Sequence, residues 1–166
     1  MFQVNDYIVY GNAGVCRVES IGPMSFGDSS TERDYYTLVP VYQKGSRVFT
    51  PVDNDKVVMR PILSQEESNA LIDSIVDIRP LEITDEKHRE DAYKEAIRTG
   101  DCTSWVRVIK TLHGRMEKRY EQGKKATSSD EKYMHLAKES LYGELAFSLS
   151  IPKDQVEEFI TERIEG

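Results

Sequence analysis

The chain has 166 residues, and its 22 Lys and Arg against 29 Asp and Glu give a formal net charge of −7. This length suits one compact domain or two small ones. No apolar run approaches the roughly 20 residues that span a bilayer, and no cationic leader precedes an apolar stretch, so a membrane or secreted protein is not expected. Cys16 and Cys102 form no Cys-x-x-Cys pair, which favours reduced thiols in a cytoplasmic protein over a disulfide scaffold.

The first 62 residues predict short β-strands. Runs rich in Val, Ile, Tyr, Phe and Thr alternate with segments rich in Gly, Asn and Asp, which are typical of turns. The expected strands cover residues 6–10, 15–21, 35–42, 47–51 and 56–59. Five short strands without a helical period between them favour a small, strongly bent β-barrel.

After Leu63 the apolar residues recur at helical spacing. Ser64 and Glu67 have the spacing of a capping box, which predicts a helix beginning there and ending before Pro80. Further helices are expected near residues 84–98, 102–122, 129–149 and 152–164, with Asp101 or Thr103 capping the third and Ser128 the fourth. The sequence therefore predicts an α+β protein in two domains, 1–62 and 63–166, the second an all-α helical bundle.

Residues capable of catalysis or metal binding show no productive spacing. The three histidines, His88, His113 and His135, stand on different expected helices and form no His-x-x-x-His pair. Phosphate-binding glycine loops and nucleophile motifs are absent from the sequence. We expect no enzyme, no metal and no cofactor; an enzyme would need a polar cleft assembled by tertiary structure alone.

The expected third helix carries a cationic ridge. Residues 105–125 hold seven basic and two acidic side chains in an otherwise acidic second half. On a helical wheel, Trp105, Ile109 and Leu112 share one arc, so a core tryptophan is favoured over a base-stacking one. The opposite arc holds Arg107, Lys110, Arg115 and Lys118. Such a ridge could lie beside a phosphate backbone or be a solvated face paired with neighbouring Glu side chains.

Several motifs, in this order along the chain, resemble the CarD/CdnL family of bacterial transcription regulators. They are the opening segment 4–10 followed by Gly14, the segment 47–54 running into 57–61, Gly100-Asp101 followed by Val108-Ile109 and Leu112, and the pattern Ser129, Glu131, Leu136-Ala137 and Leu141-Tyr142-Gly143-Glu144-Leu145-Ala146. The resemblance covers nearly the whole chain.

The resemblance implies a Tudor-like N-terminal domain that binds RNA polymerase, similar to the polymerase-interaction domain of the transcription-repair coupling factor. In the family this domain pairs a strand edge with the polymerase β subunit. The positions that match the polymerase contacts are Met24, Arg47, Val48, Phe49 and Thr50. An unpaired sheet edge suits such strand addition, because its main-chain groups bind while alternate side chains select the partner.

The resemblance also implies that the helical domain contacts promoter DNA. Family members often carry a tryptophan wedge before Gly100-Asp101, but this chain has Glu86, Lys87 and His88 there, and none of them is the flat apolar group that a wedge requires. The expected DNA-binding residues are His88, Arg89, Lys94, Arg107, Lys110, Arg115 and Lys118.

The leading hypothesis is a non-catalytic regulator in the cytoplasm, associated with the nucleoid through polymerase, whose DNA binding is weak and largely independent of sequence. The alternative is a polymerase-binding protein–protein adaptor without promoter contact.

Overall fold

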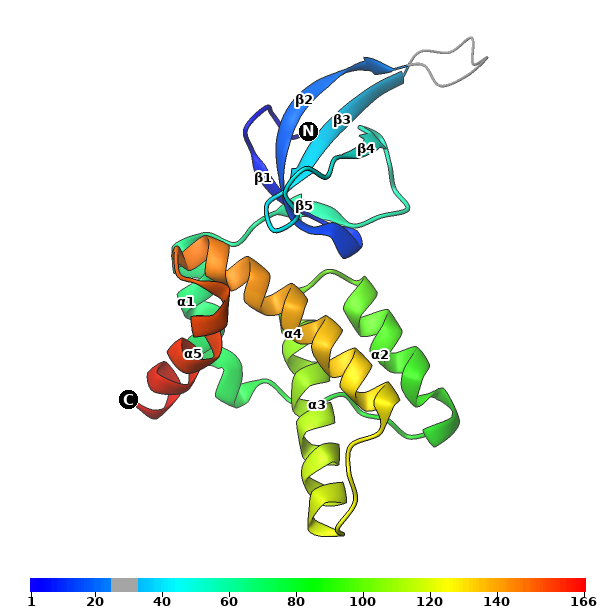
Figure 1. Ribbon diagram of the computed structural model, residues 1–166, viewed down its shortest axis with the longest axis vertical. Helices are drawn as coiled ribbons and strands as arrows, with labels where there is room; N and C mark the ends of the chain where they lie inside the picture. Colours follow the sequence, from blue (N-terminus) through cyan, green and yellow to red (C-terminus); the bar gives the residue numbers. More distant parts are fainter. Residues whose placement is uncertain (25–32) are drawn as a thin grey trace. The chain divides into compact units, whose positions relative to one another are not determined.

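The computed structural model describes residues 1–24 and 33–166, without the side chains of Asn12 and Met24. These residues form two compact units, Met1–Ile62 and Leu63–Gly166 (Figure 1). The first unit is built from β-strands and the second from α-helices.

The first unit is an antiparallel sheet with the strand order β4-β3-β2-β1-β5 (Figure 1). Its strands are β1 (Tyr7–Tyr10), β2 (Gly14–Met24), β3 (Arg33–Pro40), β4 (Val48–Pro51) and β5 (Met59–Pro61). A shift of register between Val18 and Ser20 marks a bulge in β2, which increases the local twist. Both outermost strands are short, as edge strands usually are.

One core cluster lies on a single face of the sheet, since side chains of a strand alternate between its two faces. Ile8, Cys16, Val18, Tyr36 and Leu38 are buried there. The N-terminal segment covers part of this face: the Phe2 ring lies 5.9 Å from that of Tyr36, and the Phe2 N–H donates to the Tyr36 hydroxyl at 3.1 Å.

Two expectations for this unit need revision. The barrel is not confirmed, because in the described residues β4 and β5 each pair with one neighbour and the sheet stays open. The last strand was expected at 56–59 but occupies Met59–Pro61. Its delay has a local cause: Asn54 donates to the Thr50 hydroxyl at 2.8 Å and accepts from the Lys56 N–H at 2.8 Å, which holds these residues in a turn.

The second unit contains five α-helices in the described residues (Figure 1). They are α1 (Gln65–Ser74), α2 (Arg89–Arg98), α3 (Cys102–Glu121), α4 (Ser128–Leu149) and α5 (Val156–Glu165). None of the helices in 1–24 and 33–166 is long and apolar enough to cross a membrane. Tyr93, Leu112 and Ala137, from α2, α3 and α4, meet in the core of the unit. Trp105 is also buried, and its indole N–H donates to the Ile97 carbonyl at 3.1 Å, so the prediction of a core tryptophan is confirmed.

Of the three helix caps that the sequence predicts, two are confirmed, whereas the helices expected from residues 84 and 152 begin later, at Arg89 and Val156. The Ser64–Glu67 capping box is present, and Asp101 caps α3 by accepting from the Thr103 N–H at 3.0 Å. The prediction for α4 is wrong by one residue: Thr127 is the cap, and its hydroxyl accepts from the Asp130 N–H at 3.1 Å. A cap at Thr127 places Asp130 in the first turn, where its carboxylate is buried.

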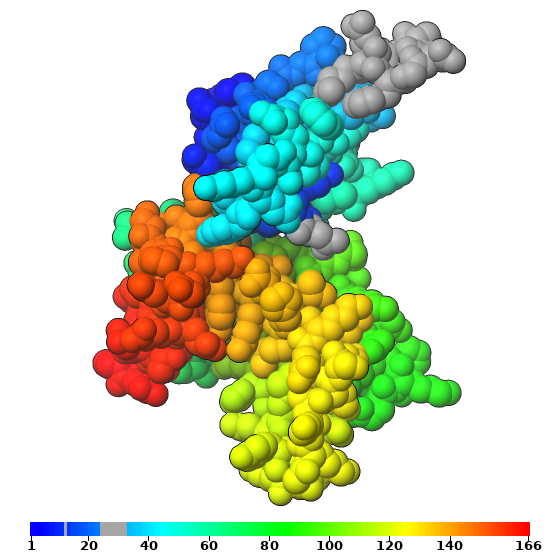
Figure 2. Space-filling model, viewed as in Figure 1, coloured from blue at the N-terminus to red at the C-terminus, as the bar shows by residue number. Residues whose placement is uncertain are grey.

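Two large apolar side chains at helix ends are exposed although they follow the helical spacing of the sequence. Val76, just after α1, and Tyr120, near the end of α3, expose 62% and 82% of their surface. Figure 2 shows the end of α3 and its connection to α4, in yellow, at the surface of the helical unit. Helical spacing alone therefore does not bury the side chain of Tyr120.

Candidate functional site

The first candidate site is the outer edge of β4. This strand pairs with β3 on one side, through Tyr36–Thr50, Thr37–Phe49 and Leu38–Val48, and with no strand of the described residues on the other. The segment 47–50, whose role was inferred from the family resemblance, therefore contains most of an edge strand.

The phase of the ladder shows which main-chain groups point outward. The Val52 N–H donates to the Asp34 carbonyl at 3.0 Å, and hydrogen-bonded pairs alternate with non-bonded pairs in an antiparallel ladder. Val48 and Thr50 consequently bond to β3, whereas Phe49 points its N–H and C=O away from it. Pro51 also belongs to the outward set, so its missing N–H costs the ladder nothing. The open edge offers Phe49 as its central donor and acceptor.

The side chains of β4 divide between core and solvent. Thr50 is buried and Val48 packs against the core of the sheet, but Phe49 exposes 47% of its surface. A large exposed aromatic next to free main-chain groups can bind a partner by both backbone pairing and apolar contact.

Arg47, directly before β4, is held by a bidentate ion pair. Its Nε and Nη2 lie 2.9 and 3.1 Å from the two carboxylate oxygens of Glu19. The hydrogen bond from Arg47 lowers the pKa of Glu19, which keeps the carboxylate charged. Met24 ends β2 opposite Arg33, and its side chain lies outside the described part of the structure. Both polymerase-contact assignments stay predictions.

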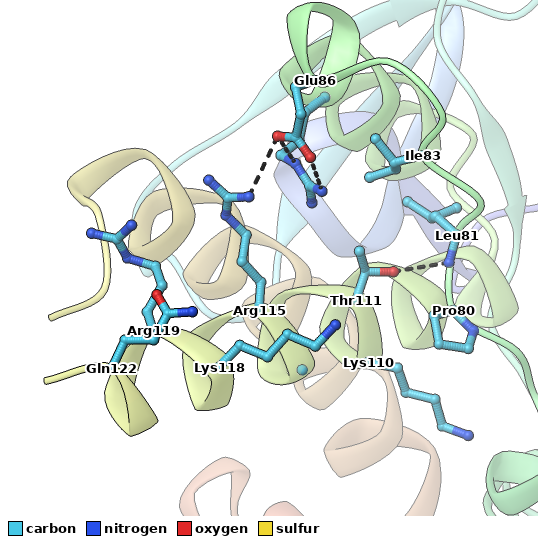
Figure 3. Close-up of a pocket in the computed structure, with 12 residues that line it drawn as sticks. Pro80, Leu81, Ile83, Glu86, Lys110, Thr111, Arg115, Lys118, Arg119 and Gln122 are labelled. Carbon is cyan, nitrogen blue, oxygen red and sulfur yellow. Dashed lines mark hydrogen bonds and ion pairs between the residues drawn. The ribbon is translucent and has the colours of Figure 1, made fainter. Parts of the chain in front are cut away.

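The second candidate site is a groove of about 520 Å³ beside α3 (Figure 3). One wall is α3 itself, and the other is the segment 80–89, which contains the 3-10 turn η3 (Glu86–His88) and the first residue of α2. Of the predicted DNA-binding residues, Arg89, Lys110, Arg115 and Lys118 line it. His88, Lys94 and Arg107 do not.

Two arginines of the groove are fixed by carboxylates. Arg89 binds both oxygens of Glu86, at 2.9 and 2.7 Å, and donates to the Tyr93 hydroxyl at 2.6 Å. The hydrogen bond that Arg89 donates to Glu86 raises the pKa of Arg89. Arg115 donates to the buried Asp130 at 2.8 Å and lies 3.5 Å from Glu86. These pairs hold the guanidinium groups in place and neutralise part of their charge.

Two further cations of the ridge bind main-chain carbonyls. The Lys110 ammonium donates to the carbonyls of Ile75 and, at 2.6 Å, of Ile78, just beyond α1. Arg107 donates to the Arg79 carbonyl at 3.2 Å. Both residues thus tie the segment that follows α1 to α3, which gives them a structural role in this unit.

The remaining predicted residues are more accessible. Lys94 and Lys118 are exposed, and within 1–24 and 33–166 neither ammonium group has an ion-pair or hydrogen-bond partner. His88 is exposed and its Nδ1 lies 2.8 Å from Asp85. The predicted DNA-binding residues are thus mixed: within 1–24 and 33–166, Lys94 and Lys118 have no internal partner, whereas the other cations already have one.

Sequence reasoning missed Arg119 and Asp130. Arg119 lines the groove and donates through Nε to the Lys125 carbonyl at 2.9 Å. Its spacing from Arg115 would have placed it on the same helix face, so the signal was present. Asp130 gave no such signal, because its pairing with Arg115 depends on how α4 packs against α3.

In the described part of the chain, no group of three or more His, Cys, Asp or Glu could hold a metal ion.

Two family models match the chain. The model of the CarD-like/TRCF RID domain matches residues 2–63, and that of the CarD C-terminal domain matches residues 78–161. The chain belongs to the CarD family.

The two matches confirm the family resemblance. CarD-like domains indicate a transcription regulator that interacts with RNA polymerase. The CarD family consists of non-catalytic regulators, in keeping with the expected function. No curated protein matches the chain. In this CarD-family chain the β4 edge falls within the first matched segment and the α3 groove within the second.

Proposed function

We propose that this CarD-family chain binds the β subunit of RNA polymerase by strand addition at β4 and carries its helical unit to upstream promoter DNA. The observation that carries the proposal is the outward direction of the Phe49 main-chain groups on an edge strand. The regulator then acts in the cytoplasm, at the nucleoid through polymerase.

Strand addition is favoured because Phe49 offers an outward N–H, an outward C=O and an exposed apolar side chain at one position. A strand of the polymerase lobe that pairs with Phe49 would form two main-chain hydrogen bonds there, and Phe49 would lose exposed apolar surface to the same partner. Because Pro51 has no N–H, pairing must end near it, so the added strand is short and centred on Phe49.

The experiment that tests strand addition compares two substitutions of one residue. Phe49→Ala removes the ring but keeps the outward N–H, whereas Phe49→Pro removes both. Retention on the isolated polymerase β lobe should fall moderately for the first variant and to background for the second. Tyr42→Ala, which removes an exposed aromatic of the same unit outside the sheet, is the control and should retain binding. Equal retention of all three variants would refute strand addition at β4.

Promoter contact is favoured by the accessible cations of the helical unit. Lys94 and Lys118 can bind phosphate oxygens without breaking any internal ion pair. A chain with net charge −7 will bind free DNA weakly, but tethering to polymerase raises the local DNA concentration enough for weak contacts to count.

The adaptor alternative is favoured by the internal pairing of most of the predicted DNA-binding residues. Arg89 and Arg115 are tied to carboxylates, and Arg107 and Lys110 to carbonyls, which leaves few cations for DNA. Reversing Lys94 and Lys118 to Glu separates the two functions: DNA crosslinking within the polymerase complex should fall if promoter contact is made. Lys44→Glu, in the first unit, is the control. Unchanged crosslinking in the double variant would favour the adaptor.

A further inference from the structure

The face of α3 that lines the groove has an unusual composition. Arg115, Lys118, Arg119 and Gln122 follow one another at the spacing of neighbouring helix turns, so their side chains share one face. Figure 3 shows these four residues along the helix, with the segment from Pro80 to Glu86 on the other side of the groove. Three cations and an amide thus face a single hollow.

The charge of the groove is opposite to that of the chain. Five cationic side chains line it, those of Arg89, Lys110, Arg115, Lys118 and Arg119, against the single carboxylate of Glu86. The formal net charge of the whole chain is −7. A cationic hollow in an acidic protein concentrates the field on an anion that enters it.

The groove is preformed. Its wall is fastened to α3, because the Leu81 N–H donates to the Thr111 hydroxyl at 2.8 Å. Behind the groove, the buried carboxylate of Asp130 orients the guanidinium of Arg115 through Nε at 2.8 Å. The hydrogen bonds of Arg115 use its Nε and Nη1 atoms, and that of Arg119 uses its Nε. Within 1–24 and 33–166, the Nη2 atoms of both arginines have no hydrogen-bond partner. The ammonium of Lys118 adds three more donors.

We propose that this groove is a binding site for phosphoryl groups. Guanidinium and ammonium donors from successive turns of a helix suit an anion that carries several oxygens, and planar guanidinium groups match phosphate geometry best. Pro80, Leu81 and Ile83 give the opposite wall an apolar surface, against which the body of a phosphate ester can pack. A volume of about 520 Å³ falls in the range of small-molecule sites.

The phosphoryl group can come from a free organic phosphate or from a DNA backbone. The second source rests on the proposed promoter contact, whereas the first does not. Neither depends on strand addition at β4, so a failure of this inference and a failure of polymerase docking would be seen in separate experiments.

The test uses the full chain with pyrophosphate and, separately, a short DNA duplex, each followed by calorimetry and by amide NMR shifts. The variants are Lys118→Gln and the double variant Lys118→Gln/Arg119→Gln. Lys124→Gln is the control, because it removes the same charge just beyond α3 and outside the groove. Thermal unfolding of each variant verifies the fold.

We expect pyrophosphate to shift the amides of residues 111–122 and the double variant to bind it about tenfold or more weakly, with the control unchanged. Competition by the duplex would show that both sources use the groove, and duplex binding alone, lost in the double variant, would assign it to DNA. The proposal is overturned if neither ligand binds, or if Lys124→Gln weakens binding as much as the groove variants do.

Discussion

At the scale of single residues, the helical unit depends on carboxylates whose partners come from distant parts of the chain. Glu144 on α4 is 1% exposed, and its two oxygens accept from the Leu63 N–H at 2.9 Å and from the Cys102 thiol at 3.2 Å. A buried carboxylate is tolerated only when hydrogen bonds satisfy it. Glu144 therefore joins the first residue of the unit, the start of α3 and the core of α4.

Replacing Glu144 should destabilise the protein much more than replacing an exposed glutamate. Glu144→Ala leaves the Leu63 N–H without its acceptor and opens a cavity, so we expect a loss of about 2 kcal/mol or more in the free energy of unfolding. Glu139→Ala, which breaks only the exposed ion pair with Lys153, should cost less than about 1 kcal/mol. Urea denaturation measures both, and equal losses would contradict this role for Glu144.

The Glu86–Arg89 pair gives a pH dependence of known sign. The hydrogen bond from Arg89 lowers the pKa of Glu86 below its ordinary 4.5 in the folded protein. The pair thus stabilises the fold above the unfolded pKa, and this contribution is lost as the pH falls through the folded pKa. Arg89→Gln should raise the pKa of Glu86 toward 4.5, as followed by carboxyl NMR.

The matched control is the exposed pair Glu95–Arg98, which has the same i,i+3 spacing. Arg98→Gln should raise the pKa of Glu95 and leave that of Glu86 unchanged. If Arg89→Gln does not move the pKa of Glu86, the ion pair does not persist in solution.

Residue identities on one helix face could be predicted, but their partners could not. The wheel separated Trp105 and Leu112 from Arg115 and Lys118, and the structure keeps the first two in the core. The helix pattern does not predict that Lys110 binds the carbonyls beyond α1 or that Arg115 binds the buried Asp130, because both contacts depend on tertiary packing. For this reason the helical wheel predicted which side chains share the cationic ridge, but not which of them have internal partners.

At the scale of elements, local chemistry sets most boundaries, and errors arise where a competing local interaction intervenes. Helix α1 begins where its capping box predicts. Strand β5 begins late, because the Asn54 side chain bonds to both Thr50 and Lys56 and holds the turn. The start of α4 was misplaced because Thr127 and Ser128 can both cap, and the sequence does not rank them.

Substitution at these two positions tests the cap of α4. Thr127→Ala removes the hydroxyl that accepts from the Asp130 N–H and should cost about 1 kcal/mol in the free energy of unfolding. Ser128→Ala, at the first helical residue, should leave the free energy of unfolding unchanged or raise it by no more than about a few tenths of a kcal/mol, because Ala has a higher helix propensity than Ser. Chemical denaturation of the two variants distinguishes them, and the reverse order would place the cap at Ser128.

At the scale of the whole molecule, the two units have different roles in the proposal. The first has an open sheet edge, and the second has a cationic groove with an apolar wall. Composition and periodicity predicted strands followed by helices, but the barrel that they favoured is not confirmed, since closure of a sheet depends on strands that are distant in sequence. The open sheet matters for the proposed strand addition, because a closed barrel would have no edge at β4 for a partner strand.

The most direct test of strand addition is the hydrogen exchange of individual β4 amides, with and without the isolated polymerase β lobe. In the chain alone the Phe49 amide should exchange quickly, while the Thr50 amide, bonded to β3, should be protected. Binding of the lobe should slow exchange at Phe49 and leave Thr50 as it was. A bound lobe that leaves the Phe49 amide exchanging at its original rate would contradict the proposed docking.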